Sequence, residues 1–378
     1  MKNMEAGCCS ALKCLTHFCT RGVLVVFGFF LVALLFFSSP SFALKEQKAL
    51  AATGNHQSGF QVESHGKVTP DDGYISIKKG MPVSEVAKTL KEAGLIKSIF
   101  YFKFLAWLSG KSTKIKSGEY VFTKDSSNWD ILSTLVKGEV YLHPVTFPEG
   151  YNIYEIAKTL AEKNLLKRED FISLCYDSDF VYHLLGEKRD SLEGYLFPDT
   201  YYVSRPVNPR SLIRNMVRAF LSVYNKFSRA GRLSAGSGSV RLSRHEAVIL
   251  ASIVEKETGQ AQERSLIASV FYNRLRKKMR LESDPTILYG MMREVRDLVP
   301  LNIRKKDILR KTPYNTYRLS RFPVGPISNP GEEALKAVFK PKQSDFLYFV
   351  SRNDGSHVFS KTYKEHKKAV DYYQRGLR

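Results

Sequence analysis

A strand-and-helix unit occurs twice in this chain, and the repeat constrains how its first half can fold. Residues 75–97 align without gaps with residues 145–167, at a shift of 70 positions. Both copies contain the tetrapeptide AKTL, and a glycine stands at Gly80 in the first copy and at Gly150 in the second. In each copy a short apolar run precedes the glycine, and apolar residues at helical spacing follow it. We therefore predict a short strand, a glycine turn and an amphipathic helix in each copy.

Between the two copies the sequence predicts a second strand at 118–125 and a helix at 129–138. Residues 73–143 would then form a small α/β module, and residues 144–189 would hold the second copy. The module contains a cluster of five aromatic residues, Phe100, Tyr101, Phe102, Phe104 and Trp107. Such a cluster is either an aromatic platform for a sugar or, since the spacing is helical, part of the core.

An unbroken apolar run, Val23–Phe37, lies near the N-terminus, and its flanks extend it to a length that can cross a bilayer. Three basic residues precede it, so the N-terminus is expected in the cytoplasm and the rest outside. We therefore predict a cytoplasmic tail at 1–21, a transmembrane helix at 22–44 and a polar linker at 45–72. A cleaved signal peptide is the alternative, because 41–43 resembles a small-residue cleavage site.

The excess of positive charge limits the kinds of partner that the chain can bind. Lys and Arg outnumber Asp and Glu by 58 to 37, a net charge of +21. An anionic membrane surface, an acidic cell-wall polymer or a solvated surface without a specific partner could each explain this balance. We expect no nucleic-acid partner, because zinc-finger, basic-zipper and RNA-recognition signatures are missing.

Only Cys175 follows the apolar run, so the region after it cannot form an internal disulfide.

The borders of a helix are well marked at residues 243–259. Ser243 followed by Glu246 is a capping-box pattern, and Gly259 is a common helix stop. Periodicity also predicts helices at 209–226, 262–276 and 361–374 and a hairpin at 346–360, whereas 229–242 is expected to lack regular structure.

Glu257 is the candidate general acid of this helix. At 100° per residue it projects between Ile253 and Leu250, on the most apolar face, whereas Glu255 projects elsewhere. Burial and the negative end of the helix dipole both raise the pKa of a carboxyl group, as a general acid at neutral pH requires. From the helix alone, two solvated last-turn glutamates remain the simpler interpretation.

Several short motifs occur in order through the second half of the chain. They are GYLFPDTYY at 194–202, ASIVEKET at 251–258, SVFYNRL at 269–275, SDPTILYG at 283–290, PYNTY at 313–317, GPISNPG at 325–331 and LYFV at 347–350. Together they resemble the YceG-like endolytic murein transglycosylases.

The resemblance implies a reaction. In that family the catalytic acid is the second glutamate of the E-K-E triplet, which here is Glu257. It would protonate the glycosidic oxygen between N-acetylmuramic acid and N-acetylglucosamine. It would then accept the proton of the muramoyl 6-hydroxyl group, which closes a 1,6-anhydro ring without water. The expected function is endolytic cleavage of nascent peptidoglycan, which terminates strand elongation and needs no metal or cofactor.

The resemblance also implies an α+β fold with an N-terminal transmembrane helix, a LysM-like module at 73–143 and a catalytic domain with a helical core at 190–378. LysM modules bind glycans that contain N-acetylglucosamine; a spacer without ligand affinity is the alternative. The expected localisation is the cell inner membrane, with the catalytic domain in the periplasm. The expected partners are peptidoglycan strands, the inner membrane and cell-wall synthases of the penicillin-binding class.

Six further residues are candidates for binding substrate or stabilising the transition state: Glu255, Asp284, Tyr314, Asn315, Tyr317 and Asp199. Asp284 precedes Pro285, and this pair predicts the N-cap and first residue of a short helix that reaches Tyr289.

Two alternatives to the transglycosylase stay open. One is a non-catalytic, membrane-tethered glycan-binding scaffold that regulates cell-wall synthases; the intact E-K-E motif argues against it. The other is a hydrolytic muramidase, which would need a second carboxylate, such as Asp284 or Asp199, across the groove.

Overall fold

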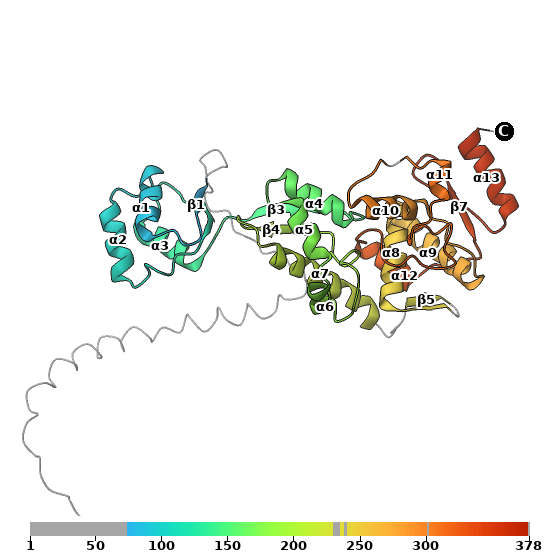
Figure 1. Cartoon of the computed structure of the whole chain (residues 1–378), viewed down its shortest axis with the longest axis horizontal. Helices are drawn as coiled ribbons and strands as arrows, with labels where there is room; N and C mark the ends of the chain where they lie inside the picture. Colours follow the sequence, from blue (N-terminus) through green and yellow to red (C-terminus); the bar gives the residue numbers. More distant parts are fainter. Residues whose placement is uncertain (1–73, 230–234, 238–239, 301, 377–378) are drawn as a thin grey trace, which may run out of the picture. The chain divides into compact units, whose positions relative to one another are not determined.

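The computed structural model describes residues 74–229, 235–237, 240–300 and 302–376 (Figure 1). The predicted tail, transmembrane helix and linker at 1–72 lie outside these residues. Within the described ranges, no helix combines the length and the apolar character needed to cross a membrane. These ranges have an α+β fold, in which the strands form four two-stranded antiparallel sheets.

Both copies of the repeat form the predicted strand, glycine turn and helix. The first copy gives β1 (Ile75–Ile77) and α1 (Val83–Glu92), and the second gives β3 (His143–Thr146) and α4 (Ile153–Glu162). Gly80 and Gly150 have φ angles of 80° and 78°, in the left-handed region that favours glycine. Both copies therefore have a glycine at this position because the turn needs a left-handed backbone conformation.

The first copy belongs to a module with its own hydrophobic core. β1 pairs with β2 (Gly118–Tyr120), and α2 (Ile99–Leu108) packs between α1 and α3 (Asn128–Lys137). The core includes Val86, Leu90 and Phe102. The module therefore has the order strand, helix, helix, strand, helix.

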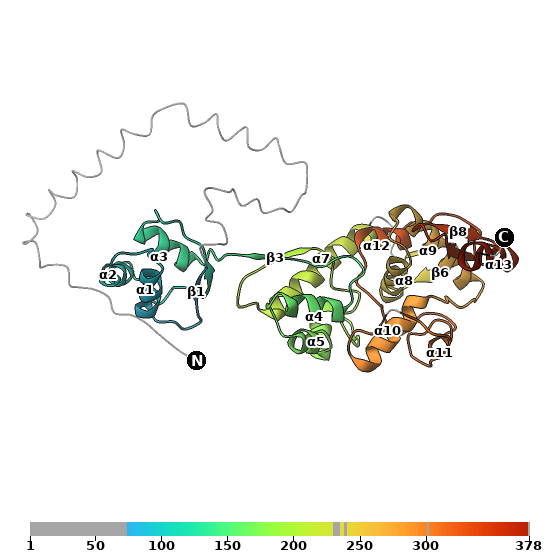
Figure 2. The same ribbon diagram turned by 90° about the horizontal axis from the view of Figure 1, so that it is seen from above.

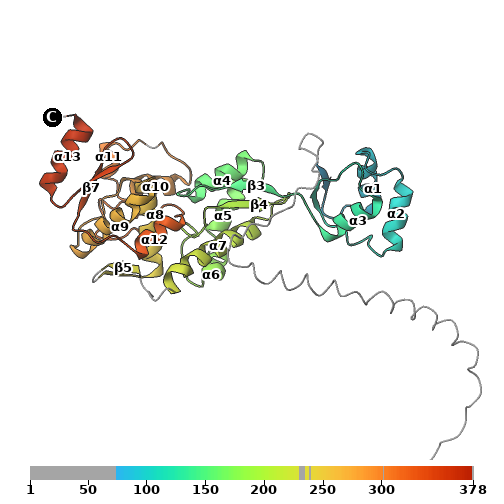
Figure 3. The ribbon, with the colours of Figure 1, turned by 180° about the vertical axis from the view of Figure 1, so that it is seen from behind.

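The second copy shares one core with the rest of the described chain, from Val145 to Phe339. β3 pairs with β4 (Thr200–Val203), and α5 (Arg168–Cys175) and α6 (Ser178–Leu185) lie between them in the sequence. α5 packs on α7 (Pro209–Arg229), as the view from behind shows (Figure 3). The predicted boundary at 189/190 thus falls between two paired strands, and the domain limits stay a prediction.

The helix α8 (Arg244–Glu257) forms the centre of this core. The capping box is present as predicted: the Ser243 hydroxyl accepts from the Glu246 amide at 3.3 Å, and the Glu246 carboxylate accepts from the Ser243 amide at 2.9 Å. Every residue from Ala247 to Glu255 is buried, because other helices cover α8 on several sides. Figures 1 and 2 show these helices, which are α9 (Ala261–Arg276), α10 (Asp284–Val295) and α12 (Glu332–Phe339).

The C-terminal elements confirm the predicted hairpin and last helix, as β7 (Tyr348–Ser351), β8 (His357–Ser360) and α13 (Tyr363–Arg375). A short helix, α11 (Lys305–Ile308), lies earlier in the chain. The prediction of no regular structure at 229–242 is wrong in part, because β5 (Ala235–Ser237) pairs with β6 (Val240–Leu242). The prediction failed because it relied on the side-chain pattern, and this segment is polar. Strands pair through their backbone groups, which do not require apolar side chains.

Candidate active site

Glu257 is the last residue of α8, and the chain turns away directly after it. Thr258 has an extended backbone, with φ −149° and ψ 138°. The Glu257 side chain is half-buried and lines a cleft with a volume of about 520 Å³. One wall of the cleft is 255–259, and the other is 148–150, directly after β3. The two walls come from the second repeat copy and from the predicted catalytic helix.

The surroundings of Glu257 bring its pKa close to neutrality. The pKa of Glu257 is raised to about 7, mainly by burial and also by the negative charge of Asp284. A hydrogen bond from Ser283 and the positive charge of Arg274 oppose these effects on the pKa. A carboxyl group with such a pKa can both donate and accept a proton near neutrality.

Ser283 is the hydrogen-bond partner of Glu257. Its hydroxyl donates to Glu257 Oε1. The Ser283 amide in turn donates to Thr316 Oγ1 at 2.9 Å, so the loop at 313–317 fixes its position. Ser283 belongs to the SDPTILYG motif but is not among the site residues predicted from the sequence.

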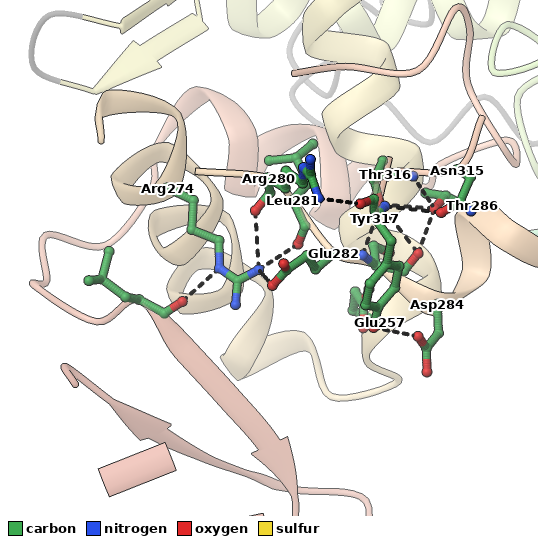
Figure 4. Close-up of polar contacts among 12 residues, drawn as sticks. Glu257, Arg274, Arg280, Leu281, Glu282, Asp284, Thr286, Asn315, Thr316 and Tyr317 are labelled. Carbon is green, nitrogen blue, oxygen red and sulfur yellow. Dashed lines mark hydrogen bonds and ion pairs between the residues drawn. The ribbon is translucent and has the colours of Figure 1, made fainter. Parts of the chain in front are cut away.

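Asp284 and Tyr317 lie next to this pair, and Figure 4 shows them with Glu257. The Tyr317 hydroxyl donates to Asp284 Oδ1 at 2.7 Å. The predicted cap is wrong by one residue: Ser283 is the N-cap of α10, Asp284 is its first residue, and the helix continues to Val295. Ser283 takes the cap position because its bond to Thr316 holds it in an extended conformation.

Glu255 lies in the same cleft, in an ion pair. Arg264 Nη2 is 2.7 Å from Glu255 Oε1 and 3.3 Å from Glu149 Oε2, so it joins the two walls. The Gly331 amide also donates to Glu255 Oε2 at 2.9 Å. Burial raises the pKa of Glu255, and the bond from Gly331 and the charge of Arg264 oppose that shift. With its oxygens already bonded, Glu255 is suited to holding the cleft rather than to donating a proton.

Tyr314 and Asn315 are buried in the loop after α11. The Asn315 amide nitrogen donates to the carbonyls of Ile308 at 2.9 Å and Arg310 at 2.7 Å. Tyr314 packs edge-on against Tyr289, with ring centroids 4.9 Å apart. Neither residue lines the cleft, and their predicted roles in substrate binding stay predictions.

Asp199 is exposed at the start of β4, where its carboxylate accepts from the Thr200 amide at 2.7 Å. It also does not line the cleft. Of the six secondary candidates, the structure thus brings Glu255, Asp284 and Tyr317 near Glu257 and leaves the other three apart.

Glu193 is a second buried carboxyl group that the sequence analysis missed. It is 1% exposed, and burial raises its pKa to about 7. It accepts hydrogen bonds from the Ile153 amide at 3.0 Å, the Tyr289 hydroxyl at 2.8 Å and the Asn329 side-chain amide at 3.0 Å. It lies in the 190–199 loop directly before the GYLFPDTYY motif, and this position was its only signal in the sequence.

Asn329 links Glu193 to the cleft. The side-chain amide of Asn329 also donates to the Tyr151 carbonyl at 2.9 Å, and the backbone carbonyl of Asn329 accepts from the Gly150 amide at 3.0 Å. Glu193 and Asn329 therefore hold the 148–150 wall in place. In the ranges that the structure describes, no group of three or more His, Cys, Asp or Glu residues is arranged to hold a metal ion.

Comparisons with known proteins place the chain in a family. The model of the YceG-like family matches residues 75–372. An endolytic murein transglycosylase from Bacillus subtilis is 33% identical over 327 residues, which cover 82% of this chain and 87% of that protein. One from Streptococcus pneumoniae is 32% identical over 325 residues, or 78% of this chain and 57% of that protein. A crystal structure of a yceG-like protein from Listeria monocytogenes has a TM-score of 0.52 and 30% identity, and covers 78% of this chain and 98% of that one.

Proposed function

Because the chain belongs to the YceG-like family, we propose that it cleaves the glycan strands of peptidoglycan as an endolytic murein transglycosylase. The observation that carries the proposal is Glu257, a half-buried carboxyl group in a cleft with a pKa of about 7. Lytic transglycosylases use one carboxyl group as acid and then as base, and such a pKa suits both roles.

In the first step, Glu257 donates its proton to the glycosidic oxygen between N-acetylmuramic acid and N-acetylglucosamine. The bond from that oxygen to the anomeric carbon breaks, and the oxygen leaves as the 4-hydroxyl group of N-acetylglucosamine. Positive charge develops on the muramoyl ring. The carboxylates of Glu257 and Asp284 both favour that charge, which assigns Asp284 a stabilising role.

In the second step, the muramoyl 6-hydroxyl group attacks the anomeric carbon and gives its proton to the Glu257 carboxylate. A 1,6-anhydro ring closes, and Glu257 regains the proton with which it began. The hydrogen bond from Ser283 stabilises the carboxylate between the two steps. Tyr317 holds Asp284 beside the ring, and Glu255 holds the cleft wall through Arg264.

The remaining proposals concern place and partners. The apolar run at 23–37 supports a single-pass anchor in the inner membrane, which would put the cleft in the periplasm near newly made strands. There, cleavage of nascent glycan beside synthases of the penicillin-binding class would terminate elongation. The strand, helix, helix, strand order of the module at 73–143 supports a LysM-like assignment.

The test is a digest of purified peptidoglycan with the full chain in detergent and with its Glu257→Gln variant. Glutamine keeps the shape and the bond from Ser283 but cannot donate an acid proton. We expect anhydromuramoyl ends from wild type and a rate loss of at least about 10²-fold in the variant, by mass spectrometry of the products. Glu333→Gln, which changes an exposed residue of α12, is the matched control and should retain wild-type activity.

Three outcomes would contradict parts of the proposal. Reducing ends in place of anhydro ends would indicate a hydrolytic muramidase. Equal cleavage by Glu257→Gln would remove Glu257 from the chemistry. If correctly folded wild type does not cut, the scaffold function becomes the better account.

A further inference from the structure

One face of α2 carries a row of exposed apolar side chains. Phe102 and Ala106 point into the module core, as do the apolar residues of α1 and α3. The other side of α2 exposes five large side chains that lie on one helical face, here named the α2 stripe: Phe100, Tyr101, Phe104, Trp107 and Leu108. Phe100 is 80% exposed, Trp107 69% and Leu108 67%. Of the five aromatic residues in the predicted cluster, only Phe102 belongs to the core.

Lysines flank the α2 stripe in the sequence. Residues 93–118 contain five lysines and no aspartate or glutamate. Lys103 is exposed on α2 itself, and Lys111 Nζ lies 4.0 Å from the ring centre of Trp129 on α3. Exposed Trp, Tyr, Phe and Leu side chains near lysines are the residue types that bind the headgroup region of an anionic membrane.

We propose that the α2 stripe docks on an anionic lipid bilayer. Its aromatic rings and Leu108 enter the boundary between headgroups and acyl chains, and the surrounding lysines contact anionic headgroups. This inference goes beyond the proposed catalysis and assigns the module a membrane-binding surface. It rests on one further expectation, that the apolar run at 23–37 anchors the chain.

The length of the chain supports a bilayer as the partner. Only 36 residues separate Phe37 from Tyr74, so the module cannot move further than about 130 Å from an anchor that ends at Phe37. Tethering at this range raises the effective concentration of the bilayer around the α2 stripe, so weak docking suffices.

The chemistry of the α2 stripe disfavours two other partners. Amide and carboxyl side chains beside the aromatic rings would favour a sugar site, yet residues 93–118 contain no Asn, Gln, Asp or Glu. A second copy of the chain would bring the same lysines against one another, and like charges at an interface are unfavourable.

The two tryptophans of the chain, Trp107 and Trp129, provide a direct test. Trp129→Phe leaves Trp107, in the α2 stripe, as the only indole. The full chain with this change is reconstituted into vesicles of phosphatidylglycerol and phosphatidylcholine, one to three, with or without bromine on the acyl chains. Insertion by about 5–10 Å brings Trp107 within reach of the bromines, so its emission should shift to the blue and fall by about half or more.

Matched variants test whether the α2 stripe itself binds. Phe100→Ser combined with Phe104→Ser changes only exposed side chains and should reduce the quenching of Trp107 several-fold. Tyr372→Ser, an exposed aromatic on α13, should leave it unchanged. Quenching should also weaken in vesicles of phosphatidylcholine alone, because the lysines lose their anionic partners.

Four results would overturn the proposal. The first is no quenching of Trp107 although flotation shows that the chain is incorporated, and the second is equal quenching without phosphatidylglycerol. A response to chitooligosaccharide in place of lipid would indicate a sugar platform. A blue shift that depends on protein density but not on bromine would indicate self-association.

Separate variants test the membrane docking of the α2 stripe and the proposed cleavage of peptidoglycan. In detergent, the Phe100→Ser and Phe104→Ser double variant should cut peptidoglycan at the wild-type rate. Glu257→Gln, in contrast, should keep the Trp107 quenching and lose the cutting.

Discussion

At the residue scale, burial is the main cause of the raised pKa of Glu257, and two consecutive residues adjust that pKa in opposite directions. Ser283 donates a hydrogen bond to the carboxylate and lowers its pKa, whereas the negative charge of Asp284 raises it. Both stand at the start of α10, so one helix terminus supplies the two opposing effects.

If Glu257 is the acid, kcat should fall as the pH rises through its pKa of about 7. Ser283→Ala removes the hydrogen bond that favours the carboxylate and so raises the pKa of Glu257. The fall in kcat on the alkaline side, here called the alkaline limb, should therefore move to higher pH. Asp284→Asn removes the charge that disfavours the carboxylate, so the limb should move to lower pH. The measurement is the pH dependence of kcat on purified peptidoglycan.

Tyr317→Phe is the control for the aspartate, since it removes the bond to Asp284 but keeps its charge. It should not reproduce the shift of Asp284→Asn. Movement of the limb in the same direction in both the Ser283 and Asp284 variants would show that Glu257 is not the group that titrates.

At the scale of elements, Gly194 explains how the 190–199 loop can cross α8. Its φ of 83° lies in the left-handed region. A side chain would also place its Cβ 2.6 Å from the Cβ of Pro326 and 2.8 Å from Cγ1 of Val248 on α8. The loop crosses so close to α8 that only glycine fits there.

Gly194→Ala should therefore cost about 3 kcal/mol or more of unfolding free energy, from backbone strain plus overpacking. Gly186→Ala is the matched comparison. Gly186 has a φ of 69°, but its added Cβ would meet no atom within 4 Å. That change should cost only about 1 kcal/mol.

Urea unfolding of the two alanine variants, followed by circular dichroism, measures the difference. Equal losses of stability would mean that the loop relaxes away from α8 and that close packing does not require the glycine.

At the scale of the whole molecule, Glu193 connects parts of the body that are distant in the sequence. Its hydrogen bonds reach the start of α4, the middle of α10 and the turn before α12. A carboxyl group at such a junction couples its protonation to the stability of the body.

The pKa of Glu193 rises from 4.5 to about 7 on folding, so the folded state binds its proton more tightly than the unfolded state. This contribution to stability is complete below pH 4.5 and is lost as the pH rises to about 7. Glu193→Gln removes the titration. The unfolding free energy of wild type relative to this variant should therefore fall by on the order of 3 kcal/mol across that interval.

Urea unfolding of both proteins below pH 4.5 and above pH 7 measures this change. Comparison with wild type at each pH removes the contributions of other groups. Glu333→Gln, at an exposed site, should show no such dependence, and a constant difference for Glu193→Gln would disprove the linkage.

The sequence by itself determined the local features. The capping box at Ser243 and the turns at Gly80 and Gly150 were predicted and are present. The hairpin at 346–360 and the long helices were also predicted, because each depends on residues a few positions apart. The angular position of Glu257 on α8 belongs to the same class, since helical geometry fixes it.

Only the tertiary structure decided what surrounds Glu257. Ser283, Arg264 and the 148–150 wall come from three separate parts of the chain, and no local pattern brings them together. The same holds for Glu193, whose burial requires partners up to 136 residues away. The periodicity of the sequence predicts which residues of one helix or strand face the core. The packing of several elements decides which carboxyl group is removed from solvent, and this burial raises its pKa.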